Sequence, residues 1–344
     1  MRAIFTDEQR ALAETIRDLS SPGLADARAM LDGKAPPSQL SNTLFGGFAG
    51  VGIPEASGGL GGGLVDVAIV LEGLGRTVVP TPFVSHVLAV QAAFGAGMDV
   101  SSALQGEQRW TLAVEERGRT PQDPATSVAG DQVTGDKVAV RDGKSASAVV
   151  ALAAGDTFVV AAPSQRQPRP AMDPSRPLAD LNFDAAQAVA TGTPATPGVL
   201  RATAALAAEL VGVGRGAVAL AVEYAKTREQ FGQPIGRFQG VAHQLADAFV
   251  GLELAWSLVL YACWAVDDGR PEATAAVHRA KAKAGEASVF ACERAMQVHG
   301  GIGITWEADP HLFLRRAVAD DAWLGPARRH RRDLGAALVA AAAR

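Results

Sequence analysis

The sequence predicts a mainly α fold that contains one small β domain, and three observations lead to this expectation. Long segments rich in Ala, Leu and Val recur at helical spacing on both sides of the middle of the chain. Between them, from Trp110 to about Ala190, the pattern changes to short runs separated by Gly, Asp and Pro, which is typical of strands. With 344 residues the chain is long enough to divide into domains. We therefore expect an N-terminal α-helical domain over 1–107, a middle β-barrel or sheet domain over 108–190 and a C-terminal four-helix bundle over 198–344.

The first region is predicted to be helical and to contain three breaks. Its opening, Phe5 to Leu19, has the periodicity of an amphipathic helix and lacks the pattern of a signal peptide. The breaks are expected at Ser20–Pro22, at Pro36–Pro37 and at the glycine-rich Gly58–Gly63. The glycine cluster lacks the Lys-Ser/Thr of a P-loop and follows no clear strand, so it is expected to form a turn and not a phosphate cradle.

The strand-like runs of the middle region read WTLAVEE, DQVTGDKVAV, ASAVVALAAG and DTFVVAAP. A linker over Thr191–Pro197 separates them from the last region. There the helical pattern returns over 200–226, 234–268 and 271–299, followed by a shorter final helix. Long helices joined by short turns predict an antiparallel bundle.

Composition and charge narrow the possible functions. A net charge of −4 gives no reason to expect nucleic acid as a partner. No uninterrupted apolar run reaches the length of a membrane span, and no metal site is expected. The two cysteines, Cys263 and Cys292, lie in helical patterns far apart in sequence and are interpreted as buried thiols in a reducing compartment. The expected location is cytoplasmic.

Two short segments carry the chemistry. The first, YAKTREQFGQPIGRFQ, places Arg228, Phe231 and Gln239 within one span. The guanidinium of Arg228 suits a phosphate oxygen, and on a helix Phe231 would lie beside it. Gln239 would share that face if the helix were unbroken, but the Gly232–Pro234 step is expected to interrupt it.

The second segment, QVHGGIG, contains Gln297 and the pair Gly300–Gly301 at the expected end of a helix. Glycines there leave backbone N–H groups accessible to an anion. His299 beside them has two interpretations, a donor to a phosphate or a ring packed against its own last turn.

These motifs resemble those of the acyl-CoA dehydrogenases, flavoenzymes that oxidise the Cα–Cβ bond of an acyl-CoA thioester. The FAD motif of that family reads Arg-x-x-Phe-Gly, then a Gln, then Gln-x-x-Gly-Gly. The resemblance runs nearly end to end, and it implies FAD as cofactor, an acyl-CoA substrate and an electron-transferring flavoprotein as acceptor. The residues that match the FAD motif are Arg228, Phe231, Gly232, Gln239, Gln297, Gly300 and Gly301.

The family uses a glutamate as catalytic base at one of two places, and this chain has an acid at neither. One place falls on Gly325 and the other on Ala202 or Thr203. The nearest acidic alternatives are Glu209, about 10 Å along the helix from the second place, and Asp321, four residues before Gly325. Asp320 and Asp321 are expected to face solvent or to pair with Arg315 and Arg316.

The part of the family site that holds the flavin ring also departs from the pattern. The first place reads Ala113–Gly118, and the second reads Val140–Ser145, where only Ser145 or Ser147 offers a hydroxyl. In the family, FAD lies across a subunit interface. The chain thus resembles the subunit without catalytic Glu of actinobacterial heteromeric (α2β2) acyl-CoA dehydrogenases, which are typical of steroid side-chain degradation.

We therefore expect a subunit that lends FAD contacts to a homologous partner carrying the glutamate. Two alternatives stay open from the sequence. One is a self-sufficient homotetramer with a relocated base, Glu209 or Asp321. The other is a non-catalytic scaffold or binding subunit that has lost flavin.

Overall fold

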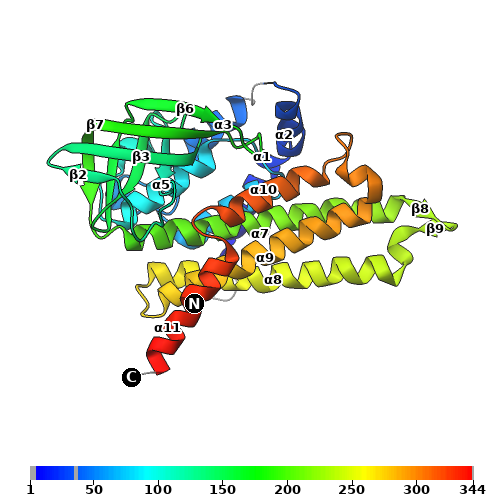
Figure 1. Ribbon diagram of the computed structural model, residues 1–344. Helices are drawn as coiled ribbons and strands as arrows, with labels where there is room; N and C mark the ends of the chain where they lie inside the picture. Colours follow the sequence, from blue (N-terminus) through cyan, green and yellow to red (C-terminus); the bar gives the residue numbers. More distant parts are fainter. Residues whose placement is uncertain (1–4, 35–37, 343–344) are drawn as a thin grey trace. The chain divides into compact units, whose positions relative to one another are not determined.

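The structure, a computed structural model, describes residues 5–34 and 38–342 (Figure 1). It divides into two compact units by internal contacts. The first comprises Met1–Lys34, Ala68–Val79 and Ala204–Arg344, and the second comprises Ala35–Val67 and Pro80–Thr203. The predicted break at Pro36–Pro37 lies outside the described residues.

Helices and strands follow one another in the order that the sequence predicts. The helices are α1 (Asp7–Ser20), α2 (Gly23–Leu31), α3 (Ser38–Phe48), α4 (Leu64–Gly75), α5 (Phe83–Gly95), α6 (Ser101–Leu104), α7 (Thr196–Thr227), α8 (Gln239–Asp267), α9 (Ala273–His299), α10 (Pro310–Ala322) and α11 (Ala327–Ala342). The strands are β1 (Trp110–Ala113), β2 (Ser127–Ala129), β3 (Gln132–Arg141), β4 (Ala148–Ala153), β5 (Thr157–Ala161), β6 (Gln165–Arg169), β7 (Leu178–Gly192), β8 (Glu229–Gln230) and β9 (Gln233–Pro234). Short 3₁₀ turns are η1 (Glu55–Ser57), η2 (Ile235–Arg237) and η3 (Gly300–Ile304).

The second unit is built on a seven-stranded sheet with the order β1-β4-β5-β7-β3-β2, in which β6 also pairs with β7. Only the β1–β4 pairing is parallel, and the other pairings in this sheet are antiparallel. Small and β-branched side chains from β3, β4, β5 and β7 form its core, as expected for strands that bury one face. Helix α5 packs against β1 and β4 and is buried along most of its length.

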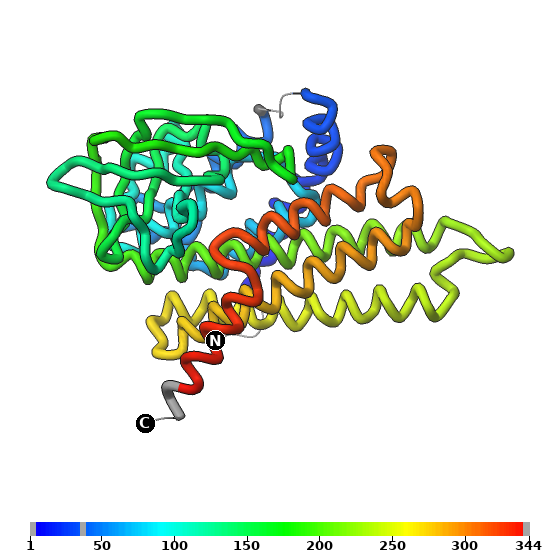
Figure 2. The backbone as a smooth tube through the Cα atoms, viewed as in Figure 1, coloured from blue at the N-terminus to red at the C-terminus, as the bar shows by residue number. Residues whose placement is uncertain are grey.

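In the first unit, α7, α8 and α9 run side by side, and α10 and α11 pack on α9 (Figures 1 and 2). The core between them is rich in alanine, which lets the helix backbones approach closely. Glycines continue this pattern: a Cβ on Gly212 of α7 would lie 2.0 Å from the carbonyl oxygen of Glu72 on α4. The long helices thus owe their packing to small residues at the contact.

The predicted first helix is confirmed, since α1 covers Asp7–Ser20 and begins with a capping box. The Thr6 hydroxyl accepts from the Gln9 N–H at 3.2 Å, and the Gln9 side chain accepts from the Thr6 N–H. The break after Ser20 is confirmed too. The glycine-rich segment after η1 is a turn, in which the N–H of Gly61 donates to the carbonyl of Ile53.

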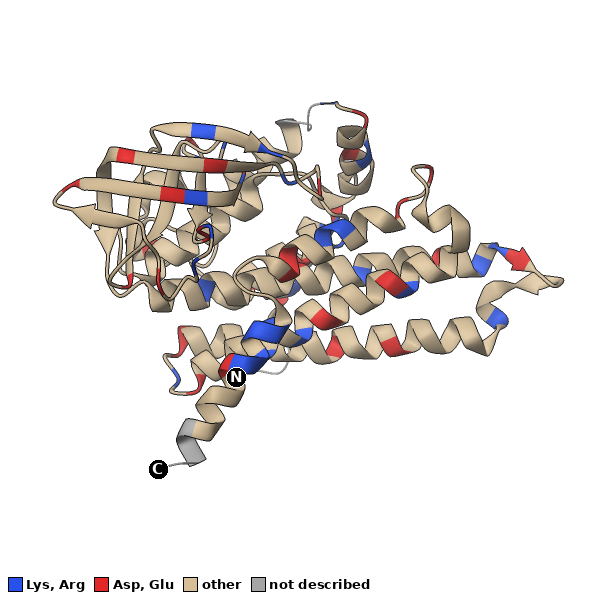
Figure 3. Ribbon diagram, viewed as in Figure 1, with Lys and Arg blue, Asp and Glu red and all other residues tan. Residues whose placement is uncertain are grey.

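By length and composition alone, α7 and α8 are long and apolar enough to cross a membrane, which the count of uninterrupted apolar residues did not predict. The most apolar window of α7 is 78% buried within the protein, and that of α8 is 33% buried. A core helix of a globular protein meets the same criterion, so α7 is explained by its burial. Helix α8 carries few charges (Figure 3) and leaves an apolar face exposed.

Candidate functional site

The first motif forms a short hairpin at one end of the first unit. Helix α7 ends at Thr227, and the backbone N–H of Arg228 still donates to the Tyr224 carbonyl at 2.8 Å. The carbonyl of Arg228 then accepts from the N–H of Ile235 at 2.8 Å, which closes the β8–β9 ladder. At its tip Phe231 and Gly232 both have positive φ, 53° and 76°, as a two-residue hairpin turn of type I′ requires.

This hairpin corrects one expectation from the sequence. Phe231 does not lie on a helix beside Arg228, because the helix has ended before both residues. The predicted interruption at Gly232–Pro234 is confirmed, and Gln239 opens the next helix, α8. The Phe231 ring is 92% exposed and makes an edge contact with Phe238 at 6.0 Å between centroids. The ring therefore lies at the surface of the hairpin, accessible to a ligand.

The second motif lies at the end of α9, as predicted. Gln297 is exposed on the last turn, and Gly300 ends the helix with φ 63°. The N–H of Gly300 donates to the carbonyl of Gln297, so it is already used and cannot serve an anion as the sequence suggested. Gly301 is exposed, and nothing lies within 4 Å of the position that its Cβ would take.

The two motifs are held at the same end of the unit by an aromatic stack. The rings of Tyr224 on α7 and His299 on α9 lie 4.3 Å apart and are nearly parallel. His299 is 8% exposed, and its Nδ1 pairs with the Ala295 carbonyl at 2.8 Å. The ring therefore packs against its own last turn, the second of the two interpretations. The hairpin and the start of η3 accordingly lie together at one end of the bundle (Figure 2).

The exposed groups of the two motifs fit the phosphates and the adenosine of FAD. Arg228 offers a planar fork of donors, Gln239 and Gln297 offer amides, and all three are exposed. Gly301 lets a ligand approach the main chain without a steric barrier. An anionic ligand at this end of the bundle would therefore meet exposed side-chain donors from both motifs.

The two base places contain no acid and leave little room for one. Gly325 is buried and has φ 101°, and a Cβ there would lie 3.1 Å from Cδ of Arg329. Ala202 and Thr203 are 0% and 3% exposed, and the Thr203 hydroxyl donates to the carbonyl of Val199 at 2.7 Å.

Both acidic alternatives have structural partners. Glu209 is fully buried and accepts from Nη1 of Arg316 at 3.2 Å, a pair with 0% exposure on both sides. The Oδ1 atom of Asp321 accepts from the N–H of Ala327 at 3.1 Å, so this carboxylate caps α11. Asp320 is buried and does not face solvent, contrary to one expectation from the sequence. These contacts assign Glu209 and Asp321 to the framework of the first unit.

The segment after β1 is organised by an internal carboxylate, which the sequence did not single out. Glu116 accepts from Lys137 Nζ at 2.6 Å and from the hydroxyl and N–H of Thr126 at 2.7 and 3.1 Å. It also accepts from the N–H of Ala125. Burial by itself would raise the pKa of Glu116, but these hydrogen bonds outweigh it and hold the pKa at about 2.

The hydroxyls of the second ring-binding place are used locally. Ser145 donates to the carbonyl of Asp142 at 3.2 Å, and Ser147 bridges the carbonyl and N–H of Arg109 at 3.0 and 2.9 Å. The hydroxyls at this place of the sheet unit therefore already form hydrogen bonds within the chain. Glu116 and Lys137 are 21 residues apart, one after β1 and the other within β3, so only the folded sheet reveals that they form a buried pair.

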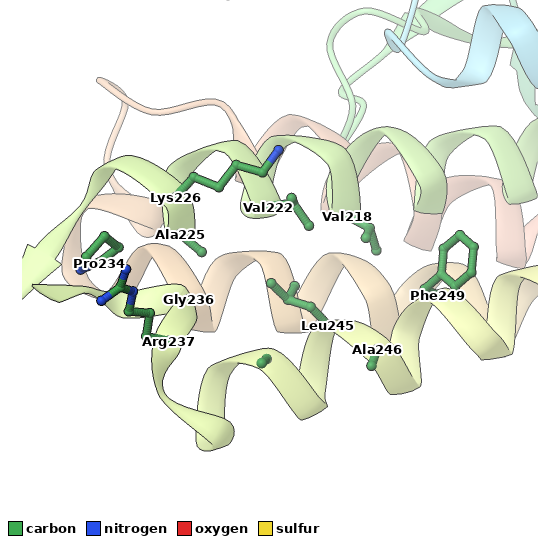
Figure 4. Close-up of a pocket in the computed structure, with 11 residues that line it drawn as sticks. Val218, Val222, Ala225, Lys226, Pro234, Gly236, Arg237, Leu245, Ala246 and Phe249 are labelled. Atoms are coloured by element: carbon green, nitrogen blue, oxygen red, sulfur yellow. The ribbon is translucent and has the colours of Figure 1, made fainter.

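A pocket of about 570 Å³ lies between α7, α8 and the hairpin (Figure 4). It is mostly apolar, with Val222 and Leu245 on facing helices and Phe249 at one end, while Lys226 and Arg237 are its cationic residues. Beyond it, the exposed face of α8 continues with Val250 and Leu254. The sequence predicted the helices but not that this face would remain uncovered within one chain.

Comparison with known proteins identifies the family. The model "Acyl-CoA dehydrogenase, C-terminal domain" matches residues 196–339, and "Acyl-CoA dehydrogenase, N-terminal domain" matches residues 6–103. The chain belongs to the acyl-CoA dehydrogenase family, so it is an oxidoreductase of that class and its cofactor is FAD.

Particular relatives are similar over nearly the whole chain. Acyl-CoA dehydrogenase IpdE2 of Mycobacterium tuberculosis is 36% identical over 321 residues, which is 90% of this chain and 91% of the relative. A variant of the Tcur3481–Tcur3483 steroid ACAD has a TM-score of 0.90 and 29% identity, covering 98% of this chain and 99% of that one. The ChsE4–ChsE5 complex of Mycobacterium tuberculosis has the same fold, with a TM-score of 0.87 and 24% identity over 98% of this chain and 99% of that chain.

Proposed function

We propose that this chain is the subunit of a hetero-oligomeric acyl-CoA dehydrogenase that lends FAD contacts to a homologous partner. Arg228, Phe231, Gln239, Gln297, Gly300 and Gly301 contact FAD whose ring, and whose catalytic glutamate, belong to that partner. The observation that carries the proposal is an asymmetry between the two halves of the family site. The side chains of the donor half are exposed, whereas the base places are occupied by Gly325 and by Ala202–Thr203, which carry no acid.

The asymmetry matters because the reaction requires both a base and a flavin. Dehydrogenation of an acyl-CoA requires a base at the α-carbon, held in a site that excludes water. FAD, when bound, supplies the acceptor for the electrons removed from the Cα–Cβ bond. Gly325 has no side chain and Ala202 has only a methyl group, so neither can take the α-proton. This chain therefore needs the carboxylate of another subunit.

The sheet unit also supports the proposal that the partner, and not this chain, holds the flavin ring. Its segment after β1 is tied down by the Glu116–Lys137 pair, and Ser145 and Ser147 already donate within the chain. These groups are therefore engaged elsewhere than with a flavin ring. In contrast, Arg228 and Gln297 extend from the bundle with exposed polar ends.

Substrate and acceptor follow from the relatives. The name of the Tcur3481–Tcur3483 structure refers to a steroid ACAD, so we infer that the acyl group here is derived from a steroid side chain. An electron-transferring flavoprotein is the proposed acceptor. The proposed location is the cytoplasm.

Arg228→Ala in the assembled complex tests the proposal. Loss of a charge-assisted hydrogen bond to phosphate, worth about 1.5–3 kcal/mol, weakens FAD binding roughly tenfold or more. The matched control is Arg270→Ala, which removes an exposed arginine from the turn between α8 and α9, outside both motifs. We expect the FAD content, measured by absorbance per complex after gel filtration, to fall only for Arg228→Ala. Equal FAD content in both variants would refute the lending of contacts.

A further inference from the structure

The connection between α10 and α11, residues 322–326, contains the place of the missing base and has an unusual conformation. Leu324 and Gly325 both have positive φ, 57° and 101°, although Leu324 carries a branched side chain. Trp323 and Leu324 are each 6% exposed, so the segment is packed and not a surface loop. Backbone in this region is costly for residues other than glycine and persists only when its surroundings enforce it.

A buried lysine on α9 supplies that enforcement. Lys281 is 0% exposed, and its Nζ donates to the carbonyl of Asp321 at 2.9 Å and to that of Gly325 at 3.1 Å. These two carbonyls flank the left-handed residues. An ammonium in the protein interior requires such acceptors, because burying it without them is expensive. The lysine and the conformation of the segment therefore depend on each other.

Two further contacts hold the segment from its sides. The Asp321 carboxylate lies against Gly285 of α9, where a Cβ would come within 2.0 Å of its Oδ1. The Nδ1 atoms of His278 on α9 and His330 on α11 lie 2.7 Å apart, so one ring donates to the other. Burial, then the charge of Lys281, lowers the pKa of His330 to about 3, and burial also lowers the pKa of His278. Both rings are neutral at neutral pH, as this shared hydrogen bond requires.

We propose that Lys281 is a positioning residue that holds the 322–326 segment in a left-handed, crowded conformation that disfavours a side chain at Gly325. At the base place, this chain then differs from the family both in the residue type and in the backbone conformation. A Cβ at Gly325 would lie 3.1 Å from Cδ of Arg329 and 3.3 Å from Nε2 of His330. A side chain introduced there meets two close neighbours and a strained backbone. This inference deepens the proposed function and rests on it for its meaning, but its test needs neither flavin nor partner.

The test is a double-mutant cycle on the FAD-free chain, with thermal unfolding as readout. Gly325→Ala is expected to lower Tm by about 5 °C, because the new Cβ strains the left-handed backbone. The control Gly335→Ala, at an exposed position of α11 with nothing within 4 Å, should not lower it. In the Lys281→Met background the cost of Gly325→Ala should fall to about half or less, since the segment can then relax.

Additive shifts in Tm would overturn the proposal, because they would mean that Lys281 stabilises the chain without acting through Gly325. Hydrogen exchange gives an independent measurement. The Gly325 amide, which donates to the carbonyl of Ala322, should exchange roughly tenfold faster in Lys281→Met than in Lys283→Met, a matched substitution two residues along α9. Should Lys281→Met not fold, Gly325→Ala alone decides: an unchanged Tm for that variant contradicts the proposal.

The experiments distinguish a failure of the proposed function from a failure of the role proposed for Lys281. If Arg228→Ala leaves FAD binding intact while the double-mutant cycle shows coupling, then Lys281 does position the 322–326 segment, but this chain does not lend contacts to FAD. If FAD is lost but the shifts are additive, the lending stands and the role of Lys281 does not.

Discussion

Glu116 and Lys137 form a buried ion pair within the sheet unit, with side-chain exposures of 5% and 0%. Such a pair contributes to stability only when hydrogen bonds satisfy its remaining atoms, and here Thr126 and Ala125 do so. The pair fixes the segment after β1, the same segment that holds the flavin ring in the family resemblance. One carboxylate thus contributes to the stability of the sheet and fixes the conformation of this segment.

The first prediction concerns the acid stability of this pair. The folded pKa of Glu116 is about 2, below its ordinary value of 4.5, so its contribution is present above pH 4.5 and is lost as pH falls through about 2. The shift corresponds to roughly 3 kcal/mol. Glu116→Gln should lose about that much stability at pH 7 and flatten the pH dependence between 4.5 and 2 in urea unfolding. Glu107→Gln, at an exposed position, is the control; equal curves for both variants would contradict this role.

The second prediction separates a structural Glu209 from a relocated base. Glu209→Gln leaves Arg316 buried without its carboxylate and should cost about 3 kcal/mol or more. Glu223→Gln, on the exposed side of α7, should cost little. In the assembled enzyme we expect an unchanged pH profile of turnover in Glu209→Gln. A loss of the acidic limb of that profile, where activity rises as the base loses its proton, together with a large fall in turnover, would instead identify Glu209 as the base.

Several site residues could be predicted from the sequence, but their conformations could not. The spacing of Arg228, Gln239 and Gln297 was sufficient to select them through the resemblance. The left-handed backbone of Phe231 is set by the hairpin that Ile235 closes, a tertiary effect that a helical pattern over 224–231 conceals. Similarly, Lys281 reads as a surface residue of an Ala- and Lys-rich helix until its two carbonyl partners are seen.

At the scale of elements, the helices were predicted more closely than the strands. The expected 271–299 corresponds to α9, and 200–226 lies within α7. The expected start of α8 at 234 was wrong, since β9 and η2 occupy the first residues and the helix begins at Gln239. The long strand β7 was not predicted, because its Asp, Asn and Ala residues lack strong β propensity and its pairing with β3, β5 and β6 determines it.

The third prediction tests the close packing of α4 on α7. Gly212→Ala places a methyl group 2.0 Å from the Glu72 carbonyl, so the helices must separate, at a cost of about 1–3 kcal/mol. Gly251→Ala in α8 meets only an ordinary contact of 3.7 Å with Ala287 and should be neutral or slightly stabilising. Chemical denaturation of both variants makes the comparison; a neutral Gly212→Ala would show that the contact is not tight.

At the scale of the whole molecule, α8 leaves an apolar stripe exposed. Phe249, Val250 and Leu254 are 53%, 55% and 55% exposed. Phe249 also lines the apolar pocket beside the hairpin (Figure 4). In water such a stripe is unfavourable, and contiguous apolar patches of this kind mark protein interfaces. A homologous subunit that covers α8 would account for both the stripe and the low burial of this helix.

The fourth prediction is that Phe249→Asp weakens assembly. A charge in the centre of an apolar contact should raise the dissociation constant of the complex by roughly tenfold to a hundredfold. Val189→Asp, at an exposed apolar position of β7 in the sheet unit, introduces the same group away from α8 and serves as control. Light scattering after gel filtration measures the masses; a complex that Phe249→Asp leaves unchanged would place the interface elsewhere.

The most direct test of the central claim is the flavin content of the chain purified alone and purified with a co-expressed homologous subunit that retains the catalytic glutamate. Absorbance per chain, together with mass and turnover, is measured in both preparations. We expect a colourless, inactive chain that becomes yellow, larger and active only with the partner. A yellow and active chain on its own would contradict the lending of FAD contacts and would show that the base lies within this chain.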